Sequence, residues 1–69
     1  MPSILGIVID LISIGSQIAE RRKSLKLSQS ELSRLAGLSR ATLDALENGR
    51  ARELGFAKVS RLLAALGLR

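Results

Sequence analysis

The 69-residue sequence predicts a small, single all-α domain. Three observations lead to this fold class. Apolar residues recur at helical spacing from residue 14 onward, serines stand where helices would begin, and glycines stand where they would end. No stretch after residue 14 alternates apolar and polar residues as a half-buried strand would. A domain of this size buries only a small core.

The first predicted helix runs from about Ser16 to Leu25, with Ile14, Ile18 and Leu25 on its apolar face. Glu20, Arg21 and Lys23 fall mostly outside that face, as solvent-facing residues do. A short break at residues 26–27 follows.

The second helix has the clearest start signal. The run Ser28–Glu31 has the pattern of a capping box, in which a serine hydroxyl accepts from an early backbone N–H and a glutamate reaches back. Gly37 is the predicted stop, because glycine readily adopts the left-handed conformation found after many helices. The predicted apolar face consists of Leu32, Leu35 and Ala36.

Ser39 is the predicted N-cap of the third helix, and the turn signal Asn48-Gly49 ends it. Leu43 and Leu46 point inward, and Leu38 packs just before the cap. A basic connector at 50–55 leads to a last helix from about Phe56 to Leu66, which Gly67 ends. Its predicted buried residues are Val59, Leu62, Leu63 and Leu66.

Charge and composition narrow the function. The chain has a formal net charge of +5. Asp10 is the one charged residue in 1–12, so the excess of positive charge lies in the helical region. A polyanion is therefore the favoured partner. Because Phe56 is the only aromatic residue, and single-strand binders stack bases on several rings, we expect double-stranded DNA.

Two of the commonest catalytic residue types are missing. The chain has no histidine and no cysteine, which removes the commonest general base, disulfides and the usual soft metal ligands. The acidic residues are dispersed among basic ones, and no glycine-rich phosphate loop follows a strand. We expect no enzyme, no cofactor and no metal, in a cytoplasmic, nucleoid-associated protein.

Residues 1–13 form an apolar N-terminal segment, distinct from the predicted domain at 14–69. The segment is too short to cross a bilayer and lacks the basic start of a secretory signal, so we expect no membrane partner. Two interpretations of it remain open: a contact with a second copy or a partner protein, or an extra helix or strand that completes the core. The apolar residues concerned are Ile4, Leu5, Ile7, Val8, Ile9, Leu11 and Ile12.

Two capped helices joined by only Gly37-Leu38-Ser39 must cross steeply. This geometry turns the polar start of the third helix outward, where it can enter a major groove. Such a helical pair is by itself a weak signal, because many small bundles contain one. The order of the residues makes it stronger.

The stretch Gln29–Gly49, QSELSRLAGLSRATLDALENG, resembles the Cro/repressor-like (XRE) helix-turn-helix family. The likeness includes the opening glutamine, the glycine in the turn, two aliphatic residues in the third helix and the closing Glu-Asn-Gly. It extends from about Ile14 to Leu68. Ser33 departs from the alanine usual in the family, but it is nearly as small. The resemblance implies a lambda-repressor-like bundle of four to five helices.

The resemblance also implies roles for individual residues. Arg40 is the best candidate for sequence readout, because arginine can bond guanine O6 and N7 together. The alternative for Arg40 is a contact with a phosphate. The full set of base-reading candidates is Ser39, Arg40, Ala41, Thr42 and Ala45. The phosphate-binding candidates are Ser28, Gln29, Asn48, Arg50 and Arg52. Asp44 is expected to be a solvated surface charge, with acceptance from a cytosine amino group as the alternative. Arg22 and Glu47 match a structural ion pair.

The function that the resemblance implies is a transcriptional repressor that binds an inverted-repeat operator as a dimer. An alternative stays open, because residues 52–68 are similar to HipB-like antitoxins. Such a protein neutralises a partner toxin and also represses its own operon.

Overall fold

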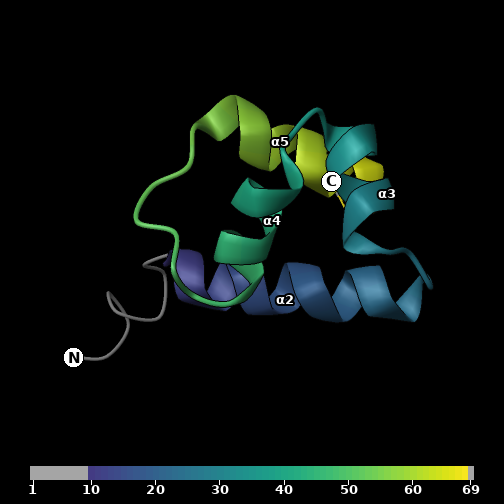
Figure 1. Ribbon diagram of the computed structural model, residues 1–69, viewed down its shortest axis with the longest axis horizontal. Coiled ribbons are helices and arrows are strands. Elements are labelled where there is room, and N and C mark those ends of the chain that lie inside the picture. Colours follow the sequence, from purple (N-terminus) through teal and green to yellow (C-terminus); the bar gives the residue numbers. More distant parts are fainter. Residues whose placement is uncertain (1–9, 69) are drawn as a thin grey trace.

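The computed structural model describes residues 10–68 of the chain. Within this range it contains four helices and no strand, so the all-α prediction is confirmed (Figure 1). The helices are α2 (Leu11–Ser24), α3 (Gln29–Ala36), α4 (Arg40–Glu47) and α5 (Phe56–Ala65). α4 packs against both α2 and α3, and α3 packs against α5. None of these four helices is long and apolar enough to cross a membrane.

The predicted start of the first helix at Ser16 is wrong, because α2 begins five residues earlier, at Leu11. Asp10 is its N-cap, and the Asp10 carboxylate accepts a 2.7 Å hydrogen bond from the Ser13 backbone N–H. The sequence did not predict the first turn of α2, because Gly15 and the neighbouring β-branched isoleucines lower the local helix propensity. The predicted boundary between residues 13 and 14 falls inside this helix. Residues 1–9 of the predicted N-terminal segment lie outside the described range.

The packing of α2 against α4 requires a glycine at position 15. A Cβ atom at this position would overlap the main-chain oxygen of Leu46 on α4. The missing side chain therefore lets the backbones of α2 and α4 approach each other directly. This close approach outweighs the cost of a glycine inside a helix, which is about 1 kcal/mol relative to alanine.

Both serine N-caps are confirmed. The Ser28 hydroxyl accepts from the Glu31 backbone N–H at 3.0 Å, and the Ser28 N–H donates to Glu31 Oε1 at 2.8 Å, which completes the capping box. The Ser39 hydroxyl accepts from the Thr42 N–H at 3.1 Å. These bonds satisfy backbone donors that a helix start leaves without partners. The predicted starts of α3 and α4 are therefore correct.

All four helices end in the same hydrogen-bonded turn, in which a backbone N–H reaches back five residues. These bonds join Leu27 to Arg22, Leu38 to Ser33, Arg50 to Ala45 and Leu68 to Leu63. The residue before each donor has a positive φ, and in α3 it is the predicted Gly37, at 69°. After α2 it is Lys26, at 60°, where a glycine would be less strained.

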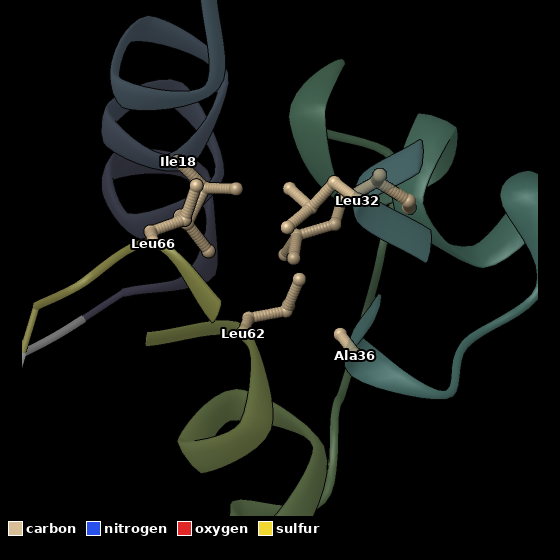
Figure 2. Close-up of a cluster of buried hydrophobic side chains, with 7 residues drawn as sticks. Ile18, Leu32, Ala36, Leu62 and Leu66 are labelled. Atoms are coloured by element: carbon tan, nitrogen blue, oxygen red, sulfur yellow. The ribbon is translucent and has the colours of Figure 1, made fainter. Parts of the chain in front are cut away.

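The core lies between the four helices (Figure 2). Its buried apolar residues are Ile18, Leu32, Ala36, Leu43, Leu46, Leu62 and Leu66. Leu35 was predicted to face inward but is 61% exposed, because neither α4 nor α5 covers that side of α3. Leu25 is also exposed, at the end of α2, and Val59 and Leu63 are only half-buried.

Two arginines attach α5 to the rest of the domain. Arg61 Nε on α5 donates to the Ala36 carbonyl at the end of α3, at 2.8 Å. Arg21 Nε on α2 donates to the Leu66 carbonyl at the end of α5, at 3.1 Å. Each cation lies where a helix presents carbonyls without helical partners and the negative end of its dipole. The side chains thus serve as helix caps as well as links between helices.

We predict that Gly15→Ala lowers the free energy of unfolding by about 2–3 kcal/mol, because the new methyl group collides with backbone rather than with a movable side chain. Helix propensity alone predicts the opposite sign. Urea unfolding of the purified protein measures the change. Gly55→Ala is the matched control, because nothing lies within 4 Å of a Cβ there. Equal stability of the two variants would contradict the close packing of α2 on α4.

Candidate nucleic-acid interface

The turn between α3 and α4 places the first turn of α4 on the outside of the domain. Leu38, in the turn, packs against the core and anchors it. Arg40 and Ala41 follow directly and are exposed. The side of α4 that carries Leu43 and Leu46 is buried, so its opposite side and its N-terminal end face solvent.

The predicted base-reading residues differ in their availability. The Arg40 guanidinium has no hydrogen-bond partner among residues 10–68, and with Ala41 and Asp44 it lines a shallow hollow of about 370 Å³. Thr42 and Ala45 are half-buried. The Ser39 hydroxyl caps α4 and donates to Thr42 Oγ1 at 2.8 Å, which leaves the Thr42 proton available to an acceptor. Arg40 and Ala41 are therefore the most accessible of the five.

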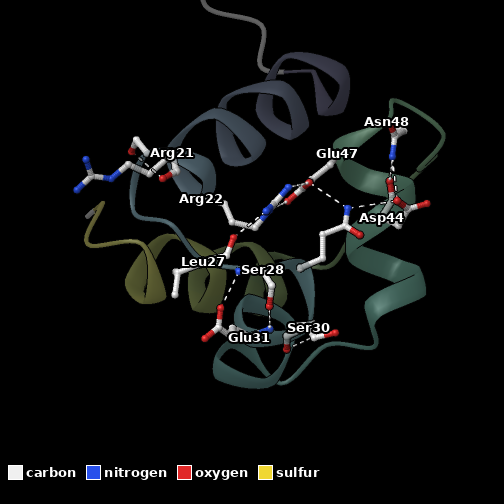
Figure 3. Close-up of polar contacts among 12 residues, drawn as sticks. Arg21, Arg22, Leu27, Ser28, Ser30, Glu31, Asp44, Glu47 and Asn48 are labelled. Atoms are coloured by element: carbon white, nitrogen blue, oxygen red, sulfur yellow. Dashed lines mark hydrogen bonds and ion pairs between the residues drawn. The ribbon is translucent and has the colours of Figure 1, made fainter.

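The Arg22 and Glu47 side chains meet between α2 and α4 (Figure 3). Arg22 Nε donates to Glu47 Oε2 at 2.7 Å, and Arg22 Nη2 donates to Glu47 Oε1 at 2.9 Å. Arg22 Nη1 donates to the Leu27 carbonyl at 2.8 Å. The two side chains are only 11% and 4% exposed. The hydrogen bonds to Glu47 raise the pKa of Arg22 above its ordinary value, although burial opposes the shift.

Gln29, at the start of α3, contacts two carboxylates rather than solvent alone. Its Nε2 donates to Glu47 Oε1 at 3.1 Å and to Asp44 Oδ1 at 3.2 Å. An amide nitrogen has two hydrogens, so both are engaged in this arrangement. The same contacts orient the amide, because its oxygen would be repelled by either carboxylate. A phosphate could accept from Gln29 only after one of these bonds is released.

Asp44 lies at the centre of a polar cluster on α4, which corrects the expectation of a solvated charge. Besides the Gln29 amide, its Oδ1 accepts from Asn48 Nδ2 at 3.0 Å, and its Oδ2 accepts from Arg50 Nη2 at 2.6 Å. The hydrogen bond from Arg50, with that from Gln29, lowers the pKa of Asp44 below its ordinary value. The carboxylate is thus ionised at neutral pH and is partnered on both oxygens.

The predicted phosphate contacts therefore fall into two groups. Gln29, Asn48 and Arg50 converge on one carboxylate. The other two do not join them: the Ser28 hydroxyl caps α3, and the exposed Arg52 has no hydrogen-bond partner among residues 10–68. Within the same range no three acidic side chains lie close enough to hold a metal ion.

Sequence reasoning missed the role of Asp44, and one signal was available. Asp44 and Asn48 stand four residues apart on a predicted helix, a spacing at which side chains meet. The contact between Asp44 and Gln29 had no such signal, because the two residues are joined only by the way α3 and α4 cross. The helix-capping roles of Arg21 and Arg61 were missed for the same reason.

The fold defines a helix-turn-helix domain. It has four helices, a glycine turn between α3 and α4, and an accessible arginine on the first turn of α4. The sequence model of a family described as helix-turn-helix matches residues 18–69. The chain belongs to this XRE-type helix-turn-helix family, as its resemblance implied. Membership supports DNA binding and transcription regulation. A search among curated proteins found no match.

We predict that Glu47→Ala lowers the free energy of unfolding by about 3 kcal/mol, because it leaves the Arg22 charge buried without its partner. DNA affinity should fall with it, since α4 loses its attachment to α2. Urea unfolding and duplex titration measure the two effects. Glu20→Ala, which removes an exposed carboxylate from α2, is the control. Unchanged stability together with unchanged affinity of Glu47→Ala would refute a structural role for the pair.

Proposed function

We propose that this protein is a sequence-specific transcriptional repressor that binds an inverted-repeat operator as a homodimer. The observation that carries the proposal is the exposed first turn of α4, where the Arg40 guanidinium has no partner among residues 10–68. An arginine at this place can donate two hydrogen bonds to the major-groove edge of guanine.

The neighbouring residues divide between base reading and backbone contact. The Ala41 methyl can meet a thymine methyl, and the Thr42 hydroxyl can donate to a base acceptor. Ser39 and Ala45 flank them, the first as the helix cap and the second half-buried. The phosphate contacts would come from Ser28, Gln29, Asn48, Arg50 and Arg52. Such contacts fix the register of the protein on the duplex but carry no sequence information.

An apolar groove between α2 and α5 supports the dimer. It has a volume of about 630 Å³, and Phe56 at its rim is 83% exposed. The lining residues are Leu11, Ile14, Gln17, Ile18, Leu54, Phe56, Val59, Leu63 and Leu68. None of them is a predicted DNA contact, so the groove stays free when α4 faces DNA. Leu11 belongs to the apolar segment 1–13, and we propose that a second copy packs here.

A dimer also fits the geometry of operators. Two recognition helices about 34 Å apart read two half-sites that are one helical turn apart. The alternative occupant of the groove is a toxin, as in the HipB-like antitoxins that residues 52–68 resemble. That function would keep DNA binding and add a protein partner, and the two proposals differ in what covers Phe56 and Val59.

Fluorescence anisotropy tests the DNA-binding proposal. The wild type should bind DNA from its own upstream region more tightly than random duplex, over a series of salt concentrations. Arg40→Ala should lose roughly ten- to a hundredfold of the specific affinity, as expected for one bidentate base contact. Arg34→Ala, the same change on an exposed residue of α3, is the control. Equal, weak and steeply salt-dependent binding of both duplexes by the wild type would sink the proposal.

Light scattering tests the dimer. We expect the wild type to have the mass of two chains and Phe56→Asp to have the mass of one, because the new charge would be buried in the apolar contact. Leu35→Asp is the control, since Leu35 is an exposed leucine outside the groove. A dimeric Phe56→Asp variant, or a monomeric wild type, would show that this groove does not hold a second copy.

A further inference from the structure

We propose that the Asp44 carboxylate is an internal competitor for DNA phosphate, which holds the donors of Gln29, Asn48 and Arg50 in the free protein and thereby weakens binding to any duplex that α4 cannot read. This inference rests on the proposed function and deepens it, because it names a residue that limits nonspecific affinity. It concerns the cluster around Asp44, of which Figure 3 labels Asp44 and Asn48.

The chemistry of the cluster matches that of a phosphate site. An ionised carboxylate and a phosphodiester are both anionic oxygen acceptors, and both bind amide N–H groups and guanidinium groups. Asp44 takes two amide donors on one oxygen and one guanidinium donor on the other. These three donors are among the five residues that we propose for phosphate contact. Asp44 therefore occupies the place of the ligand.

The number of available hydrogens makes the competition direct. Asn48 Nδ2 donates to the Asp44 main-chain oxygen at 2.9 Å and to Asp44 Oδ1 at 3.0 Å. Both Asn48 amide hydrogens are engaged, and both Gln29 amide hydrogens are engaged by Asp44 and Glu47. A phosphate can gain either amide only when a bond within the protein is released. Arg50 keeps further donors, but its charge is partly neutralised by Asp44.

The negative charge of Asp44 would lower DNA affinity, as its hydrogen bonds to the three donors would. The Asp44 side chain is 41% exposed and shares the shallow hollow on α4 with Arg40 and Ala41. Its charge therefore stays near the surface that would face DNA and repels the backbone. The low pKa of Asp44, caused mainly by the Arg50 hydrogen bond, keeps it ionised at neutral pH.

The consequence is greatest for DNA of random sequence. Nonspecific binding rests almost wholly on phosphate contacts, whereas an operator adds contacts to bases. A basic protein that binds every duplex well would be titrated by the excess of nonoperator DNA. A carboxylate that restrains the phosphate contacts leaves occupancy to depend on Arg40 and its neighbours. Asp44 would thus lower the affinity of the domain for nonoperator DNA.

The opposite role for Asp44 makes an opposite prediction. If the carboxylate arranged the three donors in the positions that phosphate needs, its removal would weaken DNA binding. If it accepted from a cytosine amino group, its removal would weaken operator binding alone. The sign of the effect of one isosteric substitution therefore separates the competitor from both of these roles.

The test is duplex titration with wild type, Asp44→Asn and Glu20→Gln, on upstream-region DNA and on random duplex over a salt series. Glu20→Gln makes the same change in net charge at an exposed position of α2, away from the cluster. We expect Asp44→Asn to bind random duplex about fivefold more tightly at low salt than Glu20→Gln does, the effect of one unit charge at contact distance in water. The salt slope should steepen by about one, as for one added phosphate contact.

A double-mutant cycle with Arg50→Gln identifies the released donor. Because Asp44 restrains Arg50 in the wild type, Arg50→Gln should cost little affinity there. The same change should cancel most of the gain in the Asp44→Asn background. Circular dichroism and thermal unfolding check that each variant is folded, which we expect for substitutions at partly exposed positions.

The outcomes separate the two proposals. Asp44→Asn binding that equals Glu20→Gln, or that is weaker than wild type on either duplex, overturns the competitor role, while a wild-type preference for upstream DNA would leave the proposed function standing. If the folded wild type and variants bind no duplex even at low salt, the proposed function fails and the competitor role fails with it.

Discussion

The position of α4 depends on one buried charge. The Arg22 guanidinium is held by Glu47 on α4 and by the Leu27 carbonyl in the turn after α2. A charge with so little exposure is tolerated only when its partners are fixed, so the pair sets how α4 lies against α2. Gln29 joins the same carboxylate from α3. The ion pair joins α2 to α4, and the Gln29 hydrogen bond adds α3 to the same carboxylate, so Glu47 connects three helices.

The rest of the domain supports this arrangement with a small apolar core and with hydrogen bonds at the helix ends. The core is small, as expected for a chain of this length, and it is built largely from leucines. Capping bonds at the helix starts, a shared hydrogen-bonded turn at the helix ends, and arginine–carbonyl bonds from Arg21 and Arg61 add to it. Gly15 allows α2 and α4 to meet backbone to backbone, close enough for Arg22 and Glu47 to bond. The fold therefore combines a few fully buried side chains with hydrogen bonds that hold the helix ends in place.

The polar surface continues from the buried pair to the face of α4. Hydrogen bonds join Glu47 to Gln29 and Gln29 to Asp44. Asp44 in turn bonds to Asn48 and to Arg50 in the connector. The inner end of this series of contacts is structural, and the outer end holds the residues that we propose for phosphate contact. On that proposal, a phosphate at the outer end competes with hydrogen bonds that the protein already makes to itself. DNA affinity would then reflect an exchange of hydrogen-bond partners as well as the positive charge of the surface.

The amino-acid sequence by itself determined the all-α class, the starts of α3 and α4, the stop at Gly37 and most of the core, because each depends on residues within about one helical turn of each other. Likeness to a family supplied the pairing of Arg22 with Glu47, which spacing alone could not. The tertiary structure decided the exposure of Leu35, the early start of α2 and the partners of Asp44. Those features depend on how helices cross, which brings together side chains as far apart in the chain as Gln29 and Asp44. No local pattern encodes such a crossing, since it is the outcome of packing the whole domain at once.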